Sequence, residues 1–273
     1  MASTAQKTDQ SFQQFYEKWK NQQNQQLQEL INASQQQVSS SSPPTNLGNL
    51  VKRVIEHYEE YYKAKSKWAD KNILLMLSPP WTSSLENALL WIGGWRPTMA
   101  IHLLYSKSGL QLEDKLGDLI QGIVIQHNLS DLSASQLRRV DELQRKTIYE
   151  EREITDKMAK QQERAADADV VELSHIVSEA MREDGNGTSK RNLEAEEYRV
   201  ESTLRPKEEG LKKILEKADN LRLKTLRSLN EILSPIEAVH FLIAAAELHL
   251  RLHEWGKAKD DRQLNGSASK IGP

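Results

Sequence analysis

Two histidines near the C-terminal end of the chain, His249 and His253, have a spacing that suits metal binding. They are four residues apart in a segment that reads as a helix, so their Cβ atoms should lie roughly 5–6 Å apart. At about 100° per residue both fall beside an apolar stripe, whereas His240 falls on the water-facing side. The stripe consists of Ala238, Phe241, Ala245, Leu248 and Leu252. Two neutral imidazoles can hold one transition-metal ion. Hydrogen-bonded core histidines and a pH switch are the alternatives.

The sequence contains none of the arrangements that usually mark an enzyme. There is no cysteine nucleophile, Gly-x-Ser-x-Gly elbow, phosphate-binding loop or zinc-protease His-Glu-x-x-His motif. Two glutamates that could act as acids or bases, Glu86 and Glu237, follow Ser83 and Ser234 by three residues, which is the spacing of a helix-capping box. We therefore expect a protein without enzymatic activity.

An aromatic segment near the N-terminus is a candidate for partner binding. Phe12, Phe15, Tyr16 and Trp19 lie in a predicted helix over residues 9–33, which precedes a Ser/Gln-rich linker at 34–46. A tethered aromatic helix can insert into a groove of a partner protein. Docking onto the rest of the same chain is the alternative.

Three of the six tryptophans lie in the stretch PPWTSSLENALLWIGGWRP, residues 79–97. Ser83 should start a short helix, the Gly93-Gly94 pair should end it, and Arg96-Pro97 should begin the next helix. Each tryptophan can bury on the order of 200 Å², so Trp81, Trp91 and Trp95 predict a major packing anchor. A pocket for a small molecule roofed by the indole rings is the alternative.

Long helices must position these residues. Low glycine and proline content, with abundant Leu, Gln, Glu, Lys and Ala, predicts an all-α fold. We expect a single bundle of long antiparallel helices, with short tryptophan-rich helices wedged in and a tethered N-terminal helix. Helices are predicted over residues 47–72, 133–164, 168–182, 206–233, with Pro206 in the first turn, and 234–257. A loop at 183–192 and disordered tails at 1–8 and 258–273 complete the predicted organisation.

Composition and charge limit the setting. The chain has 273 residues, no cysteine and a net charge of -2. No stretch approaches the roughly 20 apolar residues of a membrane span, and no secretory signal pattern occurs. We expect a soluble intracellular protein of the nucleus or cytoplasm.

Several motifs in the same order resemble the plant Delay of Germination domain family, which is related to the C-terminal half of TGA-type bZIP transcription factors. They are SFQQFYEKW (11–19), WTSSLENALLWIGGWRP (81–97), LSDLSASQLRRVDELQ (129–144) and KADNLRLKTLRSLNEILSPIEAVHFLIAAAELHLRLHEWG (217–256). The resemblance covers residues 9–257, is weakest over 145–205, and favours the dormancy branch through the HLRLHEWG ending.

The resemblance implies a regulatory protein of seed dormancy or abscisic-acid signalling. It implies binding of type 2C protein phosphatases through the aromatic segment, where Tyr16 and Trp19 match the family's aromatic positions. It also implies haem binding through His249 and His253. Any haem is non-covalent in a chain without cysteine. Because opposite axial positions are hard to reach from one straight helix, one histidine would ligate while the other supports it, or a second chain would supply the sixth ligand.

Two further functions stay open at this point. A transcriptional regulator would act on DNA or through bZIP relatives, but residues 1–45 contain only Lys7, Lys18 and Lys20 as basic residues. Direct DNA reading by a basic helix is therefore not expected. A carrier of small hydrophobic ligands would use the tryptophan-lined interior. A homo-oligomer is compatible with all of these readings.

Overall fold

Helices form the regular secondary structure wherever the chain is described. The computed structural model describes residues 2–39, 46–120, 129, 132–183 and 190–268. In chain order its helices are α1 (Ala2–Ser39), α2 (Leu47–Ala69), α3 (Ile73–Leu77), α4 (Ser84–Leu89), α5 (Thr98–Ile120), α6 (Ala134–Glu163), the 3₁₀ turn η2 (Arg164–Ala166), α7 (Ala168–Glu183), α8 (Lys190–Ile232) and α9 (Pro235–Ala268). The predicted all-α fold is confirmed.

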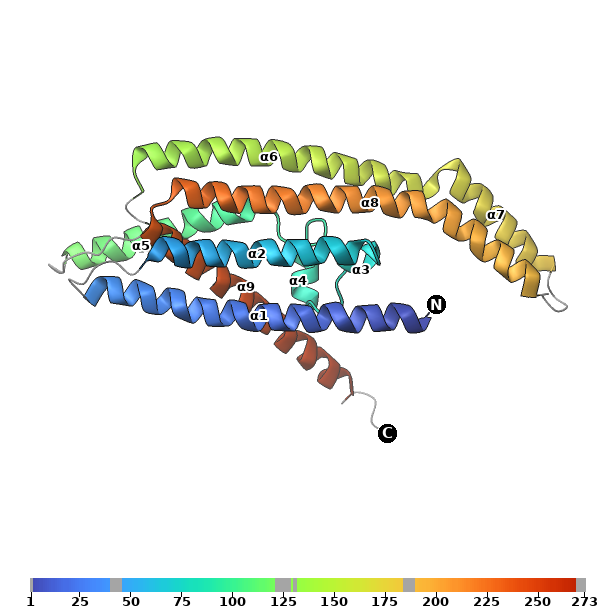
Figure 1. Cartoon of the computed structure of the whole chain (residues 1–273), viewed down its shortest axis with the longest axis horizontal. Coiled ribbons are helices and arrows are strands. Elements are labelled where there is room, and N and C mark those ends of the chain that lie inside the picture. The colour runs from blue at the N-terminus through green and yellow to red at the C-terminus, as the bar shows by residue number, and fades with distance from the viewer. Residues whose placement is uncertain (1, 40–45, 121–128, 130–131, 184–189, 269–273) are drawn as a thin grey trace.

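The long helices lie side by side along the longest axis of the molecule (Figure 1). Helix α6 packs on α8, and α2 lies between α8 and α1. Helix α9 runs obliquely to them and contacts α1, α2, α4 and α5. The hairpin of α7 and the first part of α8 extends beyond the other helices at one end (Figure 1).

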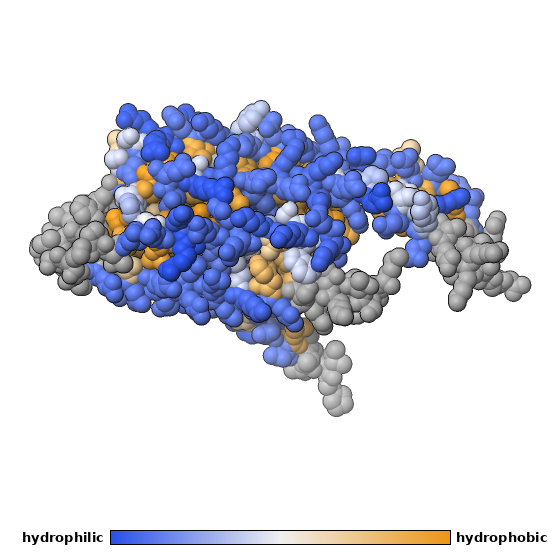
Figure 2. All heavy atoms as spheres, in the orientation of Figure 1, coloured by the Kyte–Doolittle hydropathy of each residue, from blue (hydrophilic) through white to orange (hydrophobic). Residues whose placement is uncertain are grey.

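Two apolar clusters hold α1, α2, α5, α8 and α9 together, and a third, smaller one joins α6 to α8 in the described part of the chain. The larger cluster fills the space between α2, α5, α8 and α9, and its fully buried members include Ile101, Leu104 and Leu229. The second is rich in aromatic side chains and lies between α1, α2 and the segment before α4. The surface seen in Figure 2 is mainly hydrophilic, with hydrophobic side chains showing in the grooves between helices.

Capping residues start the helices at the predicted places. Ser133 Oγ accepts a hydrogen bond from Gln136 N at 3.2 Å, and Gln136 Oε1 accepts one from Ser133 N at 2.8 Å. Before α9, Glu237 Oε2 accepts from Ser234 N at 2.7 Å, and Pro235 is the first helical residue. These contacts satisfy backbone donors that a helix start leaves open.

Some helices extend further than the sequence pattern predicts. Helix α1 begins at Ala2 and runs through the expected linker to Ser39, because glutamine favours helix nearly as well as alanine and Leu30 and Ala33 are buried. Helix α9 continues to Ala268 through part of the expected C-terminal tail. The rest of the predicted linker, loop and tails at 1, 40–45, 184–189 and 269–273 lies outside the described residues.

Pro206 was expected in a first helical turn, and this expectation is wrong. Helix α8 starts at Lys190, so Pro206 lies inside it. The turn after the proline is held from outside, because Gln161 Nε2 donates to Lys207 O at 2.8 Å and Lys207 forms an ion pair with Asp167. Prolines commonly kink helices, and α8 bends where it leaves the bundle (Figure 1).

Candidate functional site

His249 and His253 both face α1. The ring of His249 is partly buried; its Nδ1 lies 2.8 Å from Gln23 Oε1 and its Nε2 lies 3.4 Å from the Tyr16 hydroxyl. Gln23 Oε1 can only accept, so the ring proton lies on Nδ1 and Nε2 accepts from the hydroxyl. His249 is therefore a hydrogen-bonded neutral imidazole at the helix interface.

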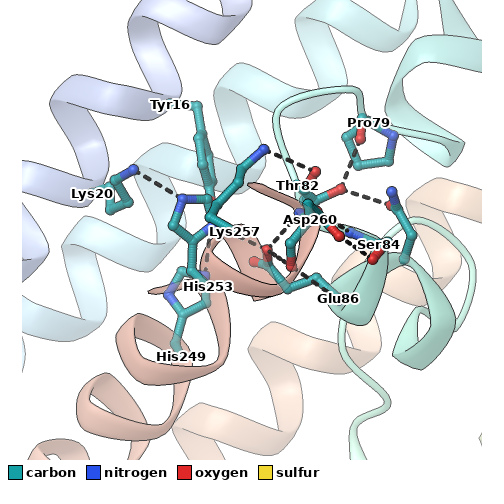
Figure 3. A network of polar contacts seen from close by, with 12 residues as sticks. Tyr16, Lys20, Pro79, Thr82, Ser84, Glu86, His249, His253, Lys257 and Asp260 are labelled. Atoms are coloured by element: carbon teal, nitrogen blue, oxygen red, sulfur yellow. Dashed lines mark hydrogen bonds and ion pairs between the residues drawn. The ribbon is translucent and has the colours of Figure 1, made fainter. Parts of the chain in front are cut away.

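His253 is buried and lies between the carboxylate of Glu86 and the ammonium of Lys20 (Figure 3). Its Nδ1 is 3.0 Å from Glu86 Oε2, and its Nε2 is 3.2 Å from Lys20 Nζ. An ammonium can only donate, so Nε2 accepts and the Nδ1 proton faces the carboxylate. The lone pairs on Nε2 of both histidines are thus directed at side chains of α1.

Glu86 is held in place by the capping box that starts α4. Its Oε2 accepts hydrogen bonds from Ser83 N and Ser83 Oγ, each at 2.7 Å. Gly256 lets α9 approach this turn, because a Cβ at that position would lie 2.0 Å from Ser83 Oγ. Further along α9, Asp260 Oδ2 accepts from Ser84 N at 2.9 Å (Figure 3). The capping glutamate predicted from sequence therefore also orients His253, a role that its spacing did not reveal.

Burial and hydrogen bonding shift the pKa values in this cluster. Burial alone would raise the pKa of Glu86, but hydrogen bonds from His253 and Ser83 outweigh it and lower the pKa to about 2. Burial, followed by the nearby Lys20 and His253, lowers the pKa of His249 to about 4, although Glu86 opposes this. At neutral pH the site thus holds the Glu86 carboxylate and the neutral imidazole of His249.

The site does not fit a resident haem while α1 is docked. An apolar cavity of about 150 Å³ holds one benzene molecule, and the cavity beside His249 has a volume of about 210 Å³, which is too small for a porphyrin. Both Nε2 lone pairs are engaged by α1. No group of three His, Cys, Asp or Glu side chains among the described residues is arranged to hold a metal ion.

The aromatic face of α1 is buried against the bundle. Phe12, Tyr16 and Trp19 are 0%, 3% and 6% exposed, and Phe15 is partly buried beside them. The Phe12 ring lies 4.8 Å from the Trp81 ring, and Trp19 stacks on His57 with ring centroids 4.8 Å apart. Trp19 Nε1 also donates to His57 O at 3.0 Å. In this conformation these side chains are part of the core and are not displayed to a partner.

Sequence reasoning missed the polar side chains that accompany this aromatic face. Gln23 and Gln26 are 3% and 5% exposed, although they belong to the glutamine-rich stretch that reads as surface. Gln23 bridges His249 and the Tyr58 hydroxyl. Their seven-residue spacing from Tyr16 and Trp19 was the signal that could have placed them on the buried face.

The tryptophan stretch is a packing anchor, as its composition predicts, but its geometry differs from the expected pair of short helices. Helix α4 ends at Leu89, and Trp91 and Gly94 pair through backbone hydrogen bonds around a turn. Gly93 has a φ of 66°, and a Cβ there would lie 2.5 Å from Met76 O. Thr98 then opens α5, which is a long helix.

The three tryptophans of this stretch have different surroundings. Trp81 is buried in the aromatic cluster, whereas Trp95 packs against the main core. Trp91 is partly buried and its Nε1 donates to Thr155 Oγ1 at 3.0 Å. Trp91 and Trp95 thus bind the turn to the long helices.

Two ionic contacts fix the turn, one buried and one with an exposed arginine, Arg96, which is the member singled out from sequence. Lys65 Nζ donates to Gly93 O at 2.7 Å and to Asp219 Oδ1 at 3.0 Å. Arg222, which is fully buried, donates to Trp95 O at 2.7 Å and pairs with Asp219.

The second contact begins at the other end of the turn. Arg96 Nε donates to Glu151 Oε2, and Thr98 N donates to Glu151 Oε1, both at 2.7 Å. Pro97, between them, is buried. These contacts connect residues far apart in sequence, which is why no local pattern predicted them.

His240 differs from its predicted position. We expected it to face water, but its side chain is partly buried, and burial followed by the nearby Lys107 lowers its pKa. The helical projection missed the neighbouring α5, which carries Lys107.

Comparisons with known proteins agree with the family resemblance of the sequence motifs. Residues 26–106 match a family described as DOG1, seed dormancy control. The chain is 32% identical over 224 residues to Protein DOG1-like 3 of Arabidopsis thaliana, covering 80% of this chain and 74% of that protein. It is 25% identical to Protein RESPONSE TO ABA AND SALT 1 of the same plant, covering 90% and 95%. Transcription factor TGA2.3 of Oryza sativa subsp. japonica is 24% identical, covering 81% and 57%.

Among the described residues, no helix combines the length and the apolar character that crossing a bilayer requires.

Proposed function

The chain belongs to the DOG1 family of seed dormancy control proteins, and we propose that it is a non-enzymatic regulator that binds signalling proteins through α1. The relatives' names connect the family with dormancy and with the response to abscisic acid. The observation that carries the proposal is the position of α1: one helix face contains both the aromatic anchors and the groups that engage His249 and His253.

Helix α1 is an exchangeable element because its docking is imperfectly satisfied. His57 Nδ1, His57 Nε2 and Gln26 Oε1 are buried and have no hydrogen-bond partner among the described residues. A buried polar atom without a partner costs about 1–3 kcal/mol. The contact between α1 and α9 includes the polar pairs Gln23–His249 and Lys20–His253, whose hydrogen bonds water can replace when the helices separate. These features lower the free energy needed to release α1.

The partner that fits the released helix is a protein with an apolar groove. Phe12, Tyr16 and Trp19 would then be inserted as large anchors, which is the recurring mode of helix recognition. By family resemblance the partner class is the type 2C protein phosphatases of abscisic-acid signalling. Binding would replace the contacts of α1 with its own bundle by contacts with the phosphatase.

A binding assay separates this mode from docking on the outer face of α1. Trp19→Ala should weaken binding of a type 2C phosphatase about thirtyfold, the effect expected for a central aromatic anchor. Lys18→Ala, which changes an exposed neighbour on the same helix, should leave affinity unchanged. The reverse ranking would show that the partner binds the exposed face and that α1 stays docked.

We propose that haem, or a bare metal ion, binds His249 and His253 only when α1 is displaced. The support is that α1 engages the Nε2 atoms of both rings, so displacement frees both Nε2 atoms. In a titration followed by absorbance, Trp19→Ala should strengthen haem binding relative to the wild type. His249→Ala/His253→Ala should remove it. Equal binding by all three proteins would exclude the pair as ligands.

A second candidate, supported by the similarity to TGA2.3, is a nuclear co-regulator that acts through bZIP relatives. The basic residues of positions 1–45 are too few for a bZIP-type DNA contact. DNA binding by this chain alone should therefore be absent in a gel-shift assay. A shift whose affinity falls steeply with salt would instead show direct phosphate contacts.

A further inference from the structure

An apolar cavity lies behind the tryptophan turn, between α1, α2, α4, α5 and α9. Its volume is about 210 Å³, and aromatic rings such as Tyr61, Trp81 and Trp95 form much of its wall. Phe241 and Ala245 of α9 close it on another side. A mainly apolar lining of this kind favours the uptake of apolar molecules.

The cavity is bordered by exposed apolar side chains. Leu89 of α4 and Leu248 of α9 line it and are 49% and 37% exposed. Leu252, also on the lining, is partly buried. Large apolar side chains exposed beside an apolar cavity favour the entry of an apolar molecule.

A buried lysine is among the residues that line this cavity. Lys65 lines the cavity and is 2% exposed. Its ammonium has three N–H donors, and within the described residues it donates to Gly93 O and Asp219 Oδ1. The third N–H has no hydrogen-bond acceptor among the described residues, and the centroid of the Tyr62 ring lies 6.0 Å from Nζ, so this donor can serve a ligand.

The charges around Lys65 do not balance. Lys65 and Arg222 are both buried, and Asp219 is the one carboxylate that pairs with them in the described residues. Burial lowers the pKa of Lys65 to about 8, with Asp219 opposing the shift, so the amine is still mostly protonated at neutral pH. A buried positive charge in excess favours an anionic group beside it.

The negative charge on the cavity lining repels an anion. Glu86 lies on the lining near His249, and its low pKa keeps it ionised at neutral pH. A carboxylate would therefore point towards Lys65, with its apolar part among the rings. By comparison with the benzene cavity of about 150 Å³, the space suits an apolar part of about eight carbon atoms.

We propose that this cavity binds small apolar monocarboxylates, with the carboxylate on Lys65. This site shares Tyr16 and Trp19 with the aromatic face of α1 and His249 with the histidine pair, but its occupation requires no release of α1. Its failure would leave the proposed function of α1 untouched.

Isothermal titration calorimetry with octanoate and 1-octanol tests the charge requirement directly. The two probes share a chain length and differ in the carboxylate. The wild type should bind octanoate about tenfold more tightly than octanol, because a charge-assisted hydrogen bond to a buried ammonium is gained. Lys65→Met should abolish that preference while Arg222 still neutralises Asp219.

A second pair of variants keeps the test independent of the ionic cluster. Ala245→Phe places a ring in the cavity and should abolish binding of both probes. Ala258→Phe, at an exposed position of the same helix, is the matched control and should bind like the wild type. Thermal unfolding followed by circular dichroism verifies that each variant is folded. The proposal is overturned if octanoate does not bind, if it binds no more tightly than octanol, or if Ala245→Phe leaves its binding unchanged.

Discussion

At the scale of single residues, the chain brings its histidines and one glutamate into a site through a few close approaches. Glu86 caps α4 and also accepts a hydrogen bond from His253 Nδ1. Gly256 permits the contact, because any larger residue would collide with Ser83. The sequence predicted the cap, the helical spacing of the histidines and their position near the core. It could not predict their partners Lys20 and Gln23, which come from the opposite end of the chain.

Gly256→Ala should therefore destabilise the protein. The new Cβ would lie 2.0 Å from Ser83 Oγ, and overpacking of this kind typically costs about 1–3 kcal/mol. Gly109→Ala is the control: it meets no atom within 4 Å in α5 and should stabilise by about 0.5–1 kcal/mol. Urea denaturation measures both changes. Equal effects in the two variants would show that α9 and α4 do not approach as closely as described.

Buried histidines should make stability depend on pH. Burial lowers the pKa of both His57 and His249 from 6.5 to about 4. The folded state then binds fewer protons than the unfolded chain between these values, so stability is full above about pH 6.5 and falls as pH drops towards 4. Glu86, with its pKa lowered from 4.5 to about 2, contributes a further loss only below about pH 4.5.

His57→Phe isolates the part of this effect that comes from His57. It retains a ring stacked on Trp19 and removes two buried nitrogens without partners. We expect a gain of about 1 kcal/mol at pH 7 and a shallower fall in the free energy of unfolding between pH 6.5 and 4.5. Denaturation at several pH values measures this. A variant that loses stability as steeply as the wild type would exclude His57 as a contributor.

At the scale of helices, local signals located the elements well and their limits less well. The capping boxes of α4 and α6 and the Ser-Pro start of α9 lie where the sequence places them. The predicted helix start at Pro206 was wrong because local rules treat an interior proline as a boundary. Contacts with α6 and Asp167 keep α8 continuous through this residue. Likewise, the glutamine-rich part of α1 stays helical because distant side chains cover it.

Removing the interior proline should stabilise α8. Pro206 is exposed, so its replacement by alanine alters no buried contact. The restored helical hydrogen bond and better propensity outweigh the lost rigidity of the unfolded chain, which gives a gain of about 1–2 kcal/mol. Arg205→Ala, at the preceding exposed position, should change stability by less than about 0.5 kcal/mol. Thermal denaturation compares them, and a destabilised Pro206→Ala would mean that the kink itself is required for packing.

At the scale of the whole molecule, two sets of long-range contacts determine which helices of the bundle lie together. Lys65, Asp219 and Arg222 join α2, α8 and the tryptophan turn, while α1 seals the aromatic cluster and the histidine pair. The sequence predicts the class of fold and the aromatic anchors. Which helices meet depends on contacts over more than a hundred residues, such as Lys65 with Asp219.

Asp219→Ala should destabilise the whole bundle. The substitution leaves Lys65 and Arg222 buried without their carboxylate, and breaking a buried ionic contact in this way costs about 3–5 kcal/mol. Asp261→Ala, at an exposed position on α9, is the control and should change stability by less than about 0.5 kcal/mol. Chemical denaturation gives both values. A loss below about 1 kcal/mol in Asp219→Ala would show that the cluster does not hold the turn.

The central claim is that α1 leaves its own bundle to bind a signalling protein. Hydrogen–deuterium exchange of the full chain, with and without a bound type 2C phosphatase, tests it most directly. We predict that binding increases deuterium uptake in the part of α9 that contains His249 and His253, because the helix that covers it departs. If the phosphatase binds while uptake in that part of α9 stays unchanged, α1 remains docked and the claim is contradicted.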